Sequence, residues 1–162
     1  MTAVKQTNGS RSKAGASSRL DMSLPENVQA RLARLANRYG LELVVLFGSQ
    51  ATGHANERSD FDVAYMPERR RRPNMLQLDV DLYSCLREVF PNADIHTADV
   101  RKASPLLALA VARDGIVLYE SSIGVWSRFR AYAFRQWEDV RKVVGYWHEH
   151  VDRYLRESAA YK

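Results

Sequence analysis

Two aspartates near the middle of the chain, Asp60 and Asp62, are separated by a single residue. In an extended strand, side chains two positions apart share one face and lie roughly 6 to 7 Å from each other. Two carboxylates at that separation can reach one cation or two neighbouring cations without backbone strain. Hard magnesium ions prefer oxygen ligands of this kind. The pair therefore predicts a metal site, with Asp60 and Asp62 as ligands.

A Gly48-Ser49 pair precedes these aspartates, with ten residues between Ser49 and Asp60. Because Gly48 has no Cβ atom, a phosphate could approach the backbone at that point, and Ser49 offers an amide donor and a hydroxyl donor. The pattern predicts a turn that grips phosphates beside the metal site. Chemistry on a nucleoside triphosphate needs both of these parts.

Two short strands would have to hold these groups. Leu43 to Phe47 is a continuous apolar run that ends at Gly48, which favours a strand covered on both faces. Asp60 to Met66 alternates, so that Phe61 and Val63 can face a core while the two aspartates share the other face.

The remaining periodicities predict a mixed α/β domain. Ser23 and Glu26 fit a capping box that opens a helix ending at Gly40, and a second helix runs from Met75 to Pro91. Further segments are predicted as strands at Asp94–Ala98 and Ile116–Tyr119 and as a helix at Pro105–Arg113. Residues from Val125 to about Glu157 favour one long helix, or two that break near Gly145.

The chain of 162 residues divides into three predicted parts. Residues 1–22 are polar and small, with a net positive charge, and are predicted to be a disordered basic tail. Residues 23–120 form the folded α/β domain, and residues 121–162 form an aromatic helical segment. No run reaches the roughly 18 apolar residues of a membrane span, and the start lacks a signal-peptide core, so we expect a cytoplasmic protein. The single cysteine, Cys85, is expected to be a reduced core thiol.

The string from Leu46 to Gly53, continued by Ser59-Asp60-Phe61-Asp62-Val63, resembles the signature of the DNA polymerase β-like nucleotidyltransferase superfamily, and in particular its minimal nucleotidyltransferase branch. The resemblance extends over residues 24 to 120. It implies the fold of that superfamily, a small mixed β-sheet flanked by helices, with a long C-terminal helix or helix pair. It also implies a third metal-binding carboxylate on a later strand, which matches Asp94, with Asp99 as the alternative.

This resemblance further implies a function. Members of the branch are often antitoxins encoded beside a HEPN-domain ribonuclease toxin, and some transfer AMP from ATP to a tyrosine of that toxin. We therefore expect an adenylyltransferase that uses ATP and magnesium, with two ions, and that forms a hetero-oligomer with its toxin. Neither a membrane nor a specific nucleic acid is expected as a partner. The alternatives are an antitoxin that neutralises by contact alone, and modification of a small molecule such as an aminoglycoside.

Two further features of the sequence are not included in the predicted site. His96 shares the face of Asp94 on an extended strand, but we interpret it as an ordinary polar strand position outside the site. The final helical segment carries more aromatic residues than one stripe against a small core needs, and it could pack on a partner chain or on its own domain. These residues are Trp126, Phe129, Tyr132, Phe134, Trp137, Tyr146, Trp147 and Tyr154.

Overall fold

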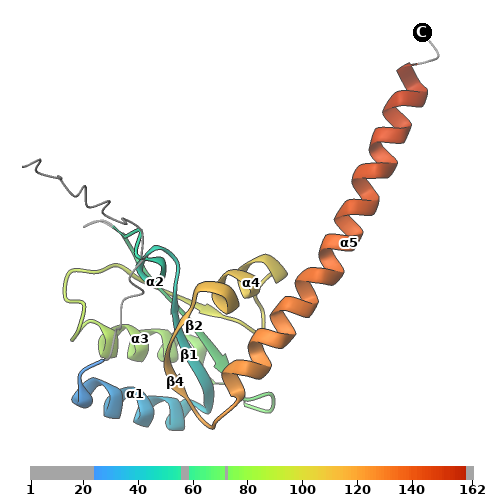
Figure 1. Ribbon diagram of the computed structural model, residues 1–162. Helices are drawn as coiled ribbons and strands as arrows, with labels where there is room; N and C mark the ends of the chain where they lie inside the picture. The colour runs from blue at the N-terminus through green and yellow to red at the C-terminus, as the bar shows by residue number, and fades with distance from the viewer. Residues whose placement is uncertain (1–23, 56–58, 72, 160–162) are drawn as a thin grey trace, which may run out of the picture.

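A computed structural model describes residues 24–55, 59–71 and 73–159, and within the last helix it leaves some side chains undescribed. The predicted tail of residues 1–22 lies outside this range. The chain forms five helices and four strands in the described part (Figure 1). In chain order they are α1 (Glu26–Tyr39), β1 (Leu41–Phe47), α2 (Ser49–Thr52), β2 (Phe61–Pro67), α3 (Met75–Leu86), β3 (Ile95–Asp99), α4 (Pro105–Asp114), β4 (Ile116–Glu120) and α5 (Val125–Ala159).

The four strands form one mixed sheet in the order β3-β2-β1-β4. Strand β1 is central and pairs antiparallel with both β2 and β4, while β3 lies parallel to β2 at one edge. The hydrophobic run of β1 matches this central position, because its residues from Leu43 to Leu46 are all buried. The prediction of a strand covered on both faces is confirmed.

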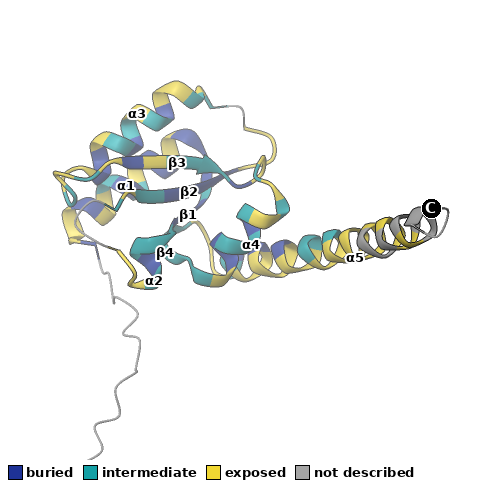
Figure 2. Ribbon diagram, turned by 90° about the horizontal axis from the view of Figure 1, so that it is seen from above, coloured by how far each residue is buried: buried dark blue, intermediate teal, exposed yellow. Residues whose placement is uncertain are grey.

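Helices cover both faces of the sheet and produce two hydrophobic clusters. Helices α1 and α3 pack on one face, and α4 with the first turns of α5 packs on the other (Figure 2). Alternate residues of β1 supply the two clusters, with Val44 and Leu46 on the α1/α3 side and Leu43 and Val45 on the α4/α5 side. The central strand therefore holds the sheet against both helical layers, and the site residues at its end are fixed by this packing.

The predicted capping box at the start of α1 is not how this helix begins. Ser23 lies outside the described residues, and the N-cap position is Pro25, which makes no side-chain capping bond. The helix is held instead by its apolar face, since Val28, Leu32 and Leu35 are buried in the core. Its predicted end is confirmed, because Gly40 takes the left-handed conformation at φ 64° that favours glycine.

One other boundary differs from the sequence prediction, and one of two predicted alternatives is confirmed for the last helix. Helix α3 ends at Leu86 rather than continuing to Pro91, and the chain then forms a turn that places the ring of Phe90 on that of Phe61, with ring centres 4.0 Å apart. Helix α5 is a single helix of 35 residues with no break at Gly145. A glycine within a helix costs only about 1 kcal/mol relative to alanine, which a helix this long tolerates.

Cys85 is buried in the α1/α3 cluster as a free thiol, as predicted, and burial raises the pKa of this thiol. A thiol kept protonated in an apolar core is unreactive. Among the described residues, no helix combines the length and apolar character needed to cross a bilayer.

Candidate active site

The turn at Gly48 is set by the end of the central strand. Strand β1 stops at Phe47, and Gly48 has a φ of 76°, a conformation that L side chains rarely adopt. The chain then makes the single helical turn α2, where the Thr52 hydroxyl lies 3.2 Å from the carbonyl oxygens of Gly48 and Ser49. The predicted turn is thus a short helical turn, closed by hydrogen bonds from the Thr52 hydroxyl to the carbonyl oxygens of Gly48 and Ser49.

The absence of a side chain at Gly48 also allows a close approach from the neighbouring strand. A Cβ atom built on Gly48 would collide with the Oδ2 atom of Asp62 on the neighbouring strand. The backbone of the turn and the carboxylate of Asp62 are therefore in close contact, and a larger residue at position 48 would have to displace this carboxylate. The two halves of the sequence motif meet at this point.

Sheet register brings Asp62 to the turn. In the antiparallel pairing of β1 with β2, Asp62 lies opposite Phe47, the last residue before Gly48. Strand β2 begins at Phe61, one residue later than predicted, so Asp60 lies just before it. A further link comes from Gln50, whose side-chain amide donates a 3.2 Å hydrogen bond to the carbonyl of Ser59 and so ties the turn to the entry of β2.

The parallel strand β3 adds the third predicted carboxylate. The amide of Phe61 donates a 2.8 Å hydrogen bond to the carbonyl of Asp94, so the residue before β3 is fixed beside the start of β2. Asp99, the alternative for this role, pairs with Tyr65 at the far end of the same two strands. Of the two aspartates, Asp94 is the one that the strand pairing brings to Asp60 and Asp62.

A histidine lies among these three carboxylates. His96 pairs with Asp62 in the β2–β3 register, and its Nδ1 atom is 3.8 Å from Asp60 Oδ2 and 3.9 Å from Asp62 Oδ1. Its Nε2 atom is 3.8 Å from Asp94 Oδ2. The sequence predicts His96 to lie outside the site, and the structure differs. The available signal was the two-residue spacing of His96 from Asp94, but only the pairing of β3 with β2 reveals that His96 lies opposite Asp62.

The electrostatics of this cluster favour a cation. Burial raises the pKa of Asp62, and the negative charge of Asp60 raises it further, while His96 acts in the opposite direction. Two carboxylates held this close, one of them partly withdrawn from water, are stabilised when positive charge is placed between them. The side chains remain accessible to a ligand, since Asp62 is 34% exposed and Asp94 is 70% exposed.

The donor set fits magnesium held jointly with a nucleotide. Within the described ranges, no three His, Cys, Asp or Glu side chains converge closely enough to enclose an ion by themselves. Magnesium is commonly bound through one or two carboxylates, with substrate phosphates and water as its other ligands, rather than by an all-protein cage. Asp60 and Asp62 beside an open backbone turn provide that incomplete set.

Comparison with known sequences confirms the nucleotidyltransferase fold that the sequence motif implied. Residues 31–123 match the sequence family described as "Polymerase beta, Nucleotidyltransferase". The protein adenylyltransferase MntA from Aphanizomenon flos-aquae is 32% identical over 123 residues, which cover 72% of this chain and 81% of that protein. The range matched by the family, residues 31–123, contains the Gly48 turn, Asp60, Asp62 and Asp94.

Solved structures with the same fold come from toxin–antitoxin complexes. A toxin–antitoxin crystal structure with AMP-PNP superposes with a TM-score of 0.59 at 22% identity, over 76% of this chain and 97% of the matched chain. A tri-AMPylated HEPN toxin in complex with its MNT antitoxin, from Shewanella oneidensis, gives a TM-score of 0.54 at 19% identity, over 78% of this chain and 97% of the matched chain. At these identities the likeness establishes the fold.

Proposed function

The chain belongs to the polymerase beta nucleotidyltransferase family, and from this premise we propose that it is an antitoxin that transfers AMP from ATP to a hydroxyl group of a cognate HEPN ribonuclease toxin. A tyrosine hydroxyl is the proposed acceptor. The modification neutralises the toxin, and the two proteins form a hetero-oligomer.

The observation that carries this proposal is the meeting of the Gly48 turn with Asp62. The Gly48 turn and the Asp60/Asp62 pair are separate sequence features, yet the β1–β2 register brings Asp62 against the turn, which supports a shared role. A triphosphate held at Gly48 and Ser49 would have its phosphates directly beside Asp60 and Asp62. Nucleotidyl transfer needs this neighbourhood, because the negative charge of the leaving pyrophosphate must be stabilised where the phosphates are held.

Each residue of the site has a proposed role. Gly48 and Ser49 bind the phosphates through the backbone and the Ser49 hydroxyl, and Asp60, Asp62 and Asp94 hold two magnesium ions. When bound, magnesium neutralises the phosphates and lowers the pKa of the acceptor hydroxyl. In the reaction, the acceptor oxygen forms a bond to the α-phosphorus, the bond from that phosphorus to the pyrophosphate oxygen breaks, and the hydroxyl proton is lost.

Relatives support the choice of acceptor and nucleotide. The relative with 32% identity is a protein adenylyltransferase, and this chain spans 81% of its length. Toxin–antitoxin structures with this fold include one that contains AMP-PNP and one with an AMPylated HEPN toxin. ATP and a protein hydroxyl are therefore better supported than a small-molecule acceptor such as an aminoglycoside.

Differential labelling of ATP tests the reaction class. The purified chain is incubated with its cognate HEPN protein, magnesium and ATP labelled at either the α- or the γ-phosphate. We expect the label on the HEPN protein from α-labelled ATP only, because the pyrophosphate carries away the γ-phosphate. Label from γ-labelled ATP would identify a phosphoryl transferase instead, and no label from either would contradict the proposal.

A second candidate function is neutralisation by contact without catalysis. The exposed apolar side chains of α5 favour it, since such a surface can bind a partner directly. Replacing both Asp60 and Asp62 by asparagine distinguishes the two in cells that express the toxin. Growth protection that depends on the aspartates supports transfer of AMP, whereas protection that survives the double substitution supports contact alone.

A further inference from the structure

Helix α5 has two parts that differ in burial. Its buried side chains, Val125, Phe129 and Ala133, all lie in the first third, where the helix packs on α4 and the sheet. No described side chain of α5 beyond Ala133 is buried. The remainder of the helix projects away from the domain (Figure 1). We refer to residues 137–151 of α5 as the arm.

Apolar side chains continue along the arm at regular spacing. The stripe consists of Trp137, Val140, Val144, Trp147 and Val151, with steps of three, four, three and four residues. The first two are partly buried, but Val144 is 45% exposed, Trp147 is 61% exposed and Val151 is 46% exposed. This alternation of three and four is the pattern of a helix that packs against another helix.

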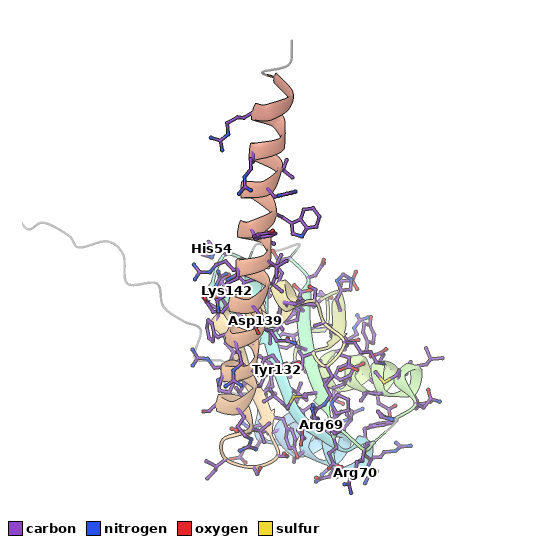
Figure 3. All side chains as sticks on the ribbon, turned by 90° about the vertical axis from the view of Figure 1, so that its right-hand side faces the viewer. His54, Arg69, Arg70, Tyr132, Asp139 and Lys142 are labelled. Atoms are coloured by element: carbon purple, nitrogen blue, oxygen red, sulfur yellow. The ribbon has the colours of Figure 1, made fainter. Side chains whose placement is uncertain are left out.

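The arm extends past the end of the domain that holds the active site. Figure 1 shows α5 starting at the opposite end of the sheet from α2, crossing α4 and continuing beyond the level of α2. In Figure 3, Tyr132, Asp139 and Lys142 follow one another along α5 toward the end where His54 lies, and the helix continues further. His54 directly follows α2 and the Gly48 turn. Figure 1 also shows the arm leaning away from α2, so a protein lying on the arm would lie beyond this end of the sheet and to one side of α2.

Charge along the arm indicates which kind of molecule would cover it. Residues 137–151 contain three acidic and two basic residues, so the arm lacks the excess positive charge that attracts nucleic acid or an anionic membrane. A protein helix is the occupant that the apolar stripe and balanced charge fit.

The positions that flank the stripe argue against a second copy of the chain. On one side lies Arg141, and on the other lie Gln136, Val143 and His150. None of these is acidic, and in a self-paired helix dimer such flanking positions face each other. Arg141 is already paired with Glu138 of its own helix, and a second copy would add no ion pair across the interface. A different helix with acidic flanking residues would.

We propose that the arm is the docking site for a helix of the acceptor protein, and that it holds this protein so that its hydroxyl reaches Gly48, Asp60 and Asp62. The inference rests on the proposed function, because it identifies the arm's occupant as the substrate of that site. Binding energy is then supplied at a distance from the reacting atoms. Loss of the arm should weaken the affinity for the acceptor protein and leave the chemistry at saturation unchanged.

The test compares the wild-type chain with the double variant Trp147→Ala/Val151→Ala. AMP transfer from α-labelled ATP is measured over a range of concentrations of the cognate HEPN protein, and the affinity for that protein is measured by calorimetry with AMP-PNP present. We expect the arm variant to raise both KM and Kd by about tenfold or more, since buried aromatic residues dominate such interfaces, with kcat within about twofold. The matched control is Leu76→Ala/Val80→Ala, an exposed apolar pair at the same spacing on α3, which should change neither constant.

Failure of the inference and failure of the proposed function give different results. Transfer with an unchanged KM and Kd in the arm variant would overturn the docking role and leave the adenylyltransferase activity standing. Binding without transfer by the wild-type chain would contradict the proposed function, and the two Kd values would then show whether the arm binds the protein. Absence of any binding by the wild-type chain would overturn the inference. A wild-type dimer that the arm variant converts to a monomer, seen by light scattering of the chain alone, would also overturn it.

Discussion

The backbone of Gly48 lies directly against the carboxylate of Asp62, so that a methyl group on Gly48 would overlap the Oδ2 atom. This contact joins the end of β1 to the start of β2, so that the Gly48-Ser49 turn and the Asp60/Asp62 pair form one site. It also makes the site sensitive to a very small change, the addition of a single carbon atom.

Gly48→Ala is therefore expected to lower stability and to reduce AMP transfer strongly. The substitution introduces strain at a φ of 76° and displaces Asp62, at a cost of about 1 to 3 kcal/mol. Urea unfolding and the transfer assay measure the two effects. Gly145→Ala is the control, because nothing lies within 4 Å of an added Cβ in α5 and the change should stabilise by about 0.5 to 1 kcal/mol. Equal effects of both substitutions would contradict the contact.

Asp62→Asn should raise the free energy of unfolding in the absence of metal and nucleotide while it reduces transfer. Burial and the neighbouring Asp60 raise the pKa of Asp62, which means that the folded chain disfavours its charged form. A neutral amide of the same shape removes that penalty. Thermal unfolding in buffer with a chelator measures the change in stability. A lower midpoint for the variant than for the wild-type protein would show that Asp62 stabilises the fold, and would contradict the expectation that this carboxylate costs stability and serves the reaction.

The bond between α1 and α3 gives a pH-dependent prediction. The hydroxyl of Tyr39 donates a 2.6 Å hydrogen bond to Oδ2 of Asp81, which lowers the pKa of Asp81 and raises that of Tyr39. A lowered carboxyl pKa contributes stability above about pH 4 that is lost as the pH falls further, and a raised phenol pKa contributes below about pH 10.

Tyr39→Phe should accordingly cost about 1.5 to 3 kcal/mol at neutral pH, as expected for a hydrogen bond to a charged group. The difference from the wild-type protein should shrink at pH values below about 4, where the Asp81 carboxylate becomes protonated. Chemical denaturation at pH 7 and at acid pH provides the comparison. A difference that stays constant over this range would mean that packing, rather than the bond to Asp81, accounts for the loss.

The two parts of α5 should respond differently to truncation. Phe129 is 4% exposed and stacks on Trp126 with ring centres 5.8 Å apart, so Phe129→Ala should destabilise by about 3 to 5 kcal/mol. Trp147 is 61% exposed, and Trp147→Ala should change stability by no more than about 0.5 kcal/mol. Calorimetric unfolding of the two variants tests this division. A large loss for Trp147→Ala would show that the arm packs on its own domain.

The sequence was sufficient to predict the strand that ends at Gly48 and the strand that carries Asp62, because their signal is local: an apolar run before Gly48 and an alternation from Asp60 onward. The fold class followed from the same periodicities and from the family resemblance. Asp94 was assigned through that resemblance, and the structure then showed it beside Phe61, with Asp99 at the far end of the strand pair.

Features that depend on pairing between distant segments were not accessible from the sequence. His96 lies among the carboxylates only because β3 joins β2 in parallel with one particular register, which periodicity cannot specify. The contact of Gly48 with Asp62 depends on the β1–β2 register in the same way. The single helix α5 was one of two alternatives, since a glycine at position 145 is compatible with either.

The central claim is that Asp60 and Asp62, beside the Gly48 turn, carry out AMP transfer to the cognate HEPN protein. It is tested most directly by incubating that protein with α-labelled ATP, magnesium and either the wild-type chain or the Asp60→Asn/Asp62→Asn variant. Metal-supplied charge stabilisation amounts to several kcal/mol, so we expect labelling to fall by about a thousandfold or more in the variant while its fold and its affinity for the HEPN protein are retained. Labelling of the HEPN protein at the wild-type rate by the folded variant would contradict the account.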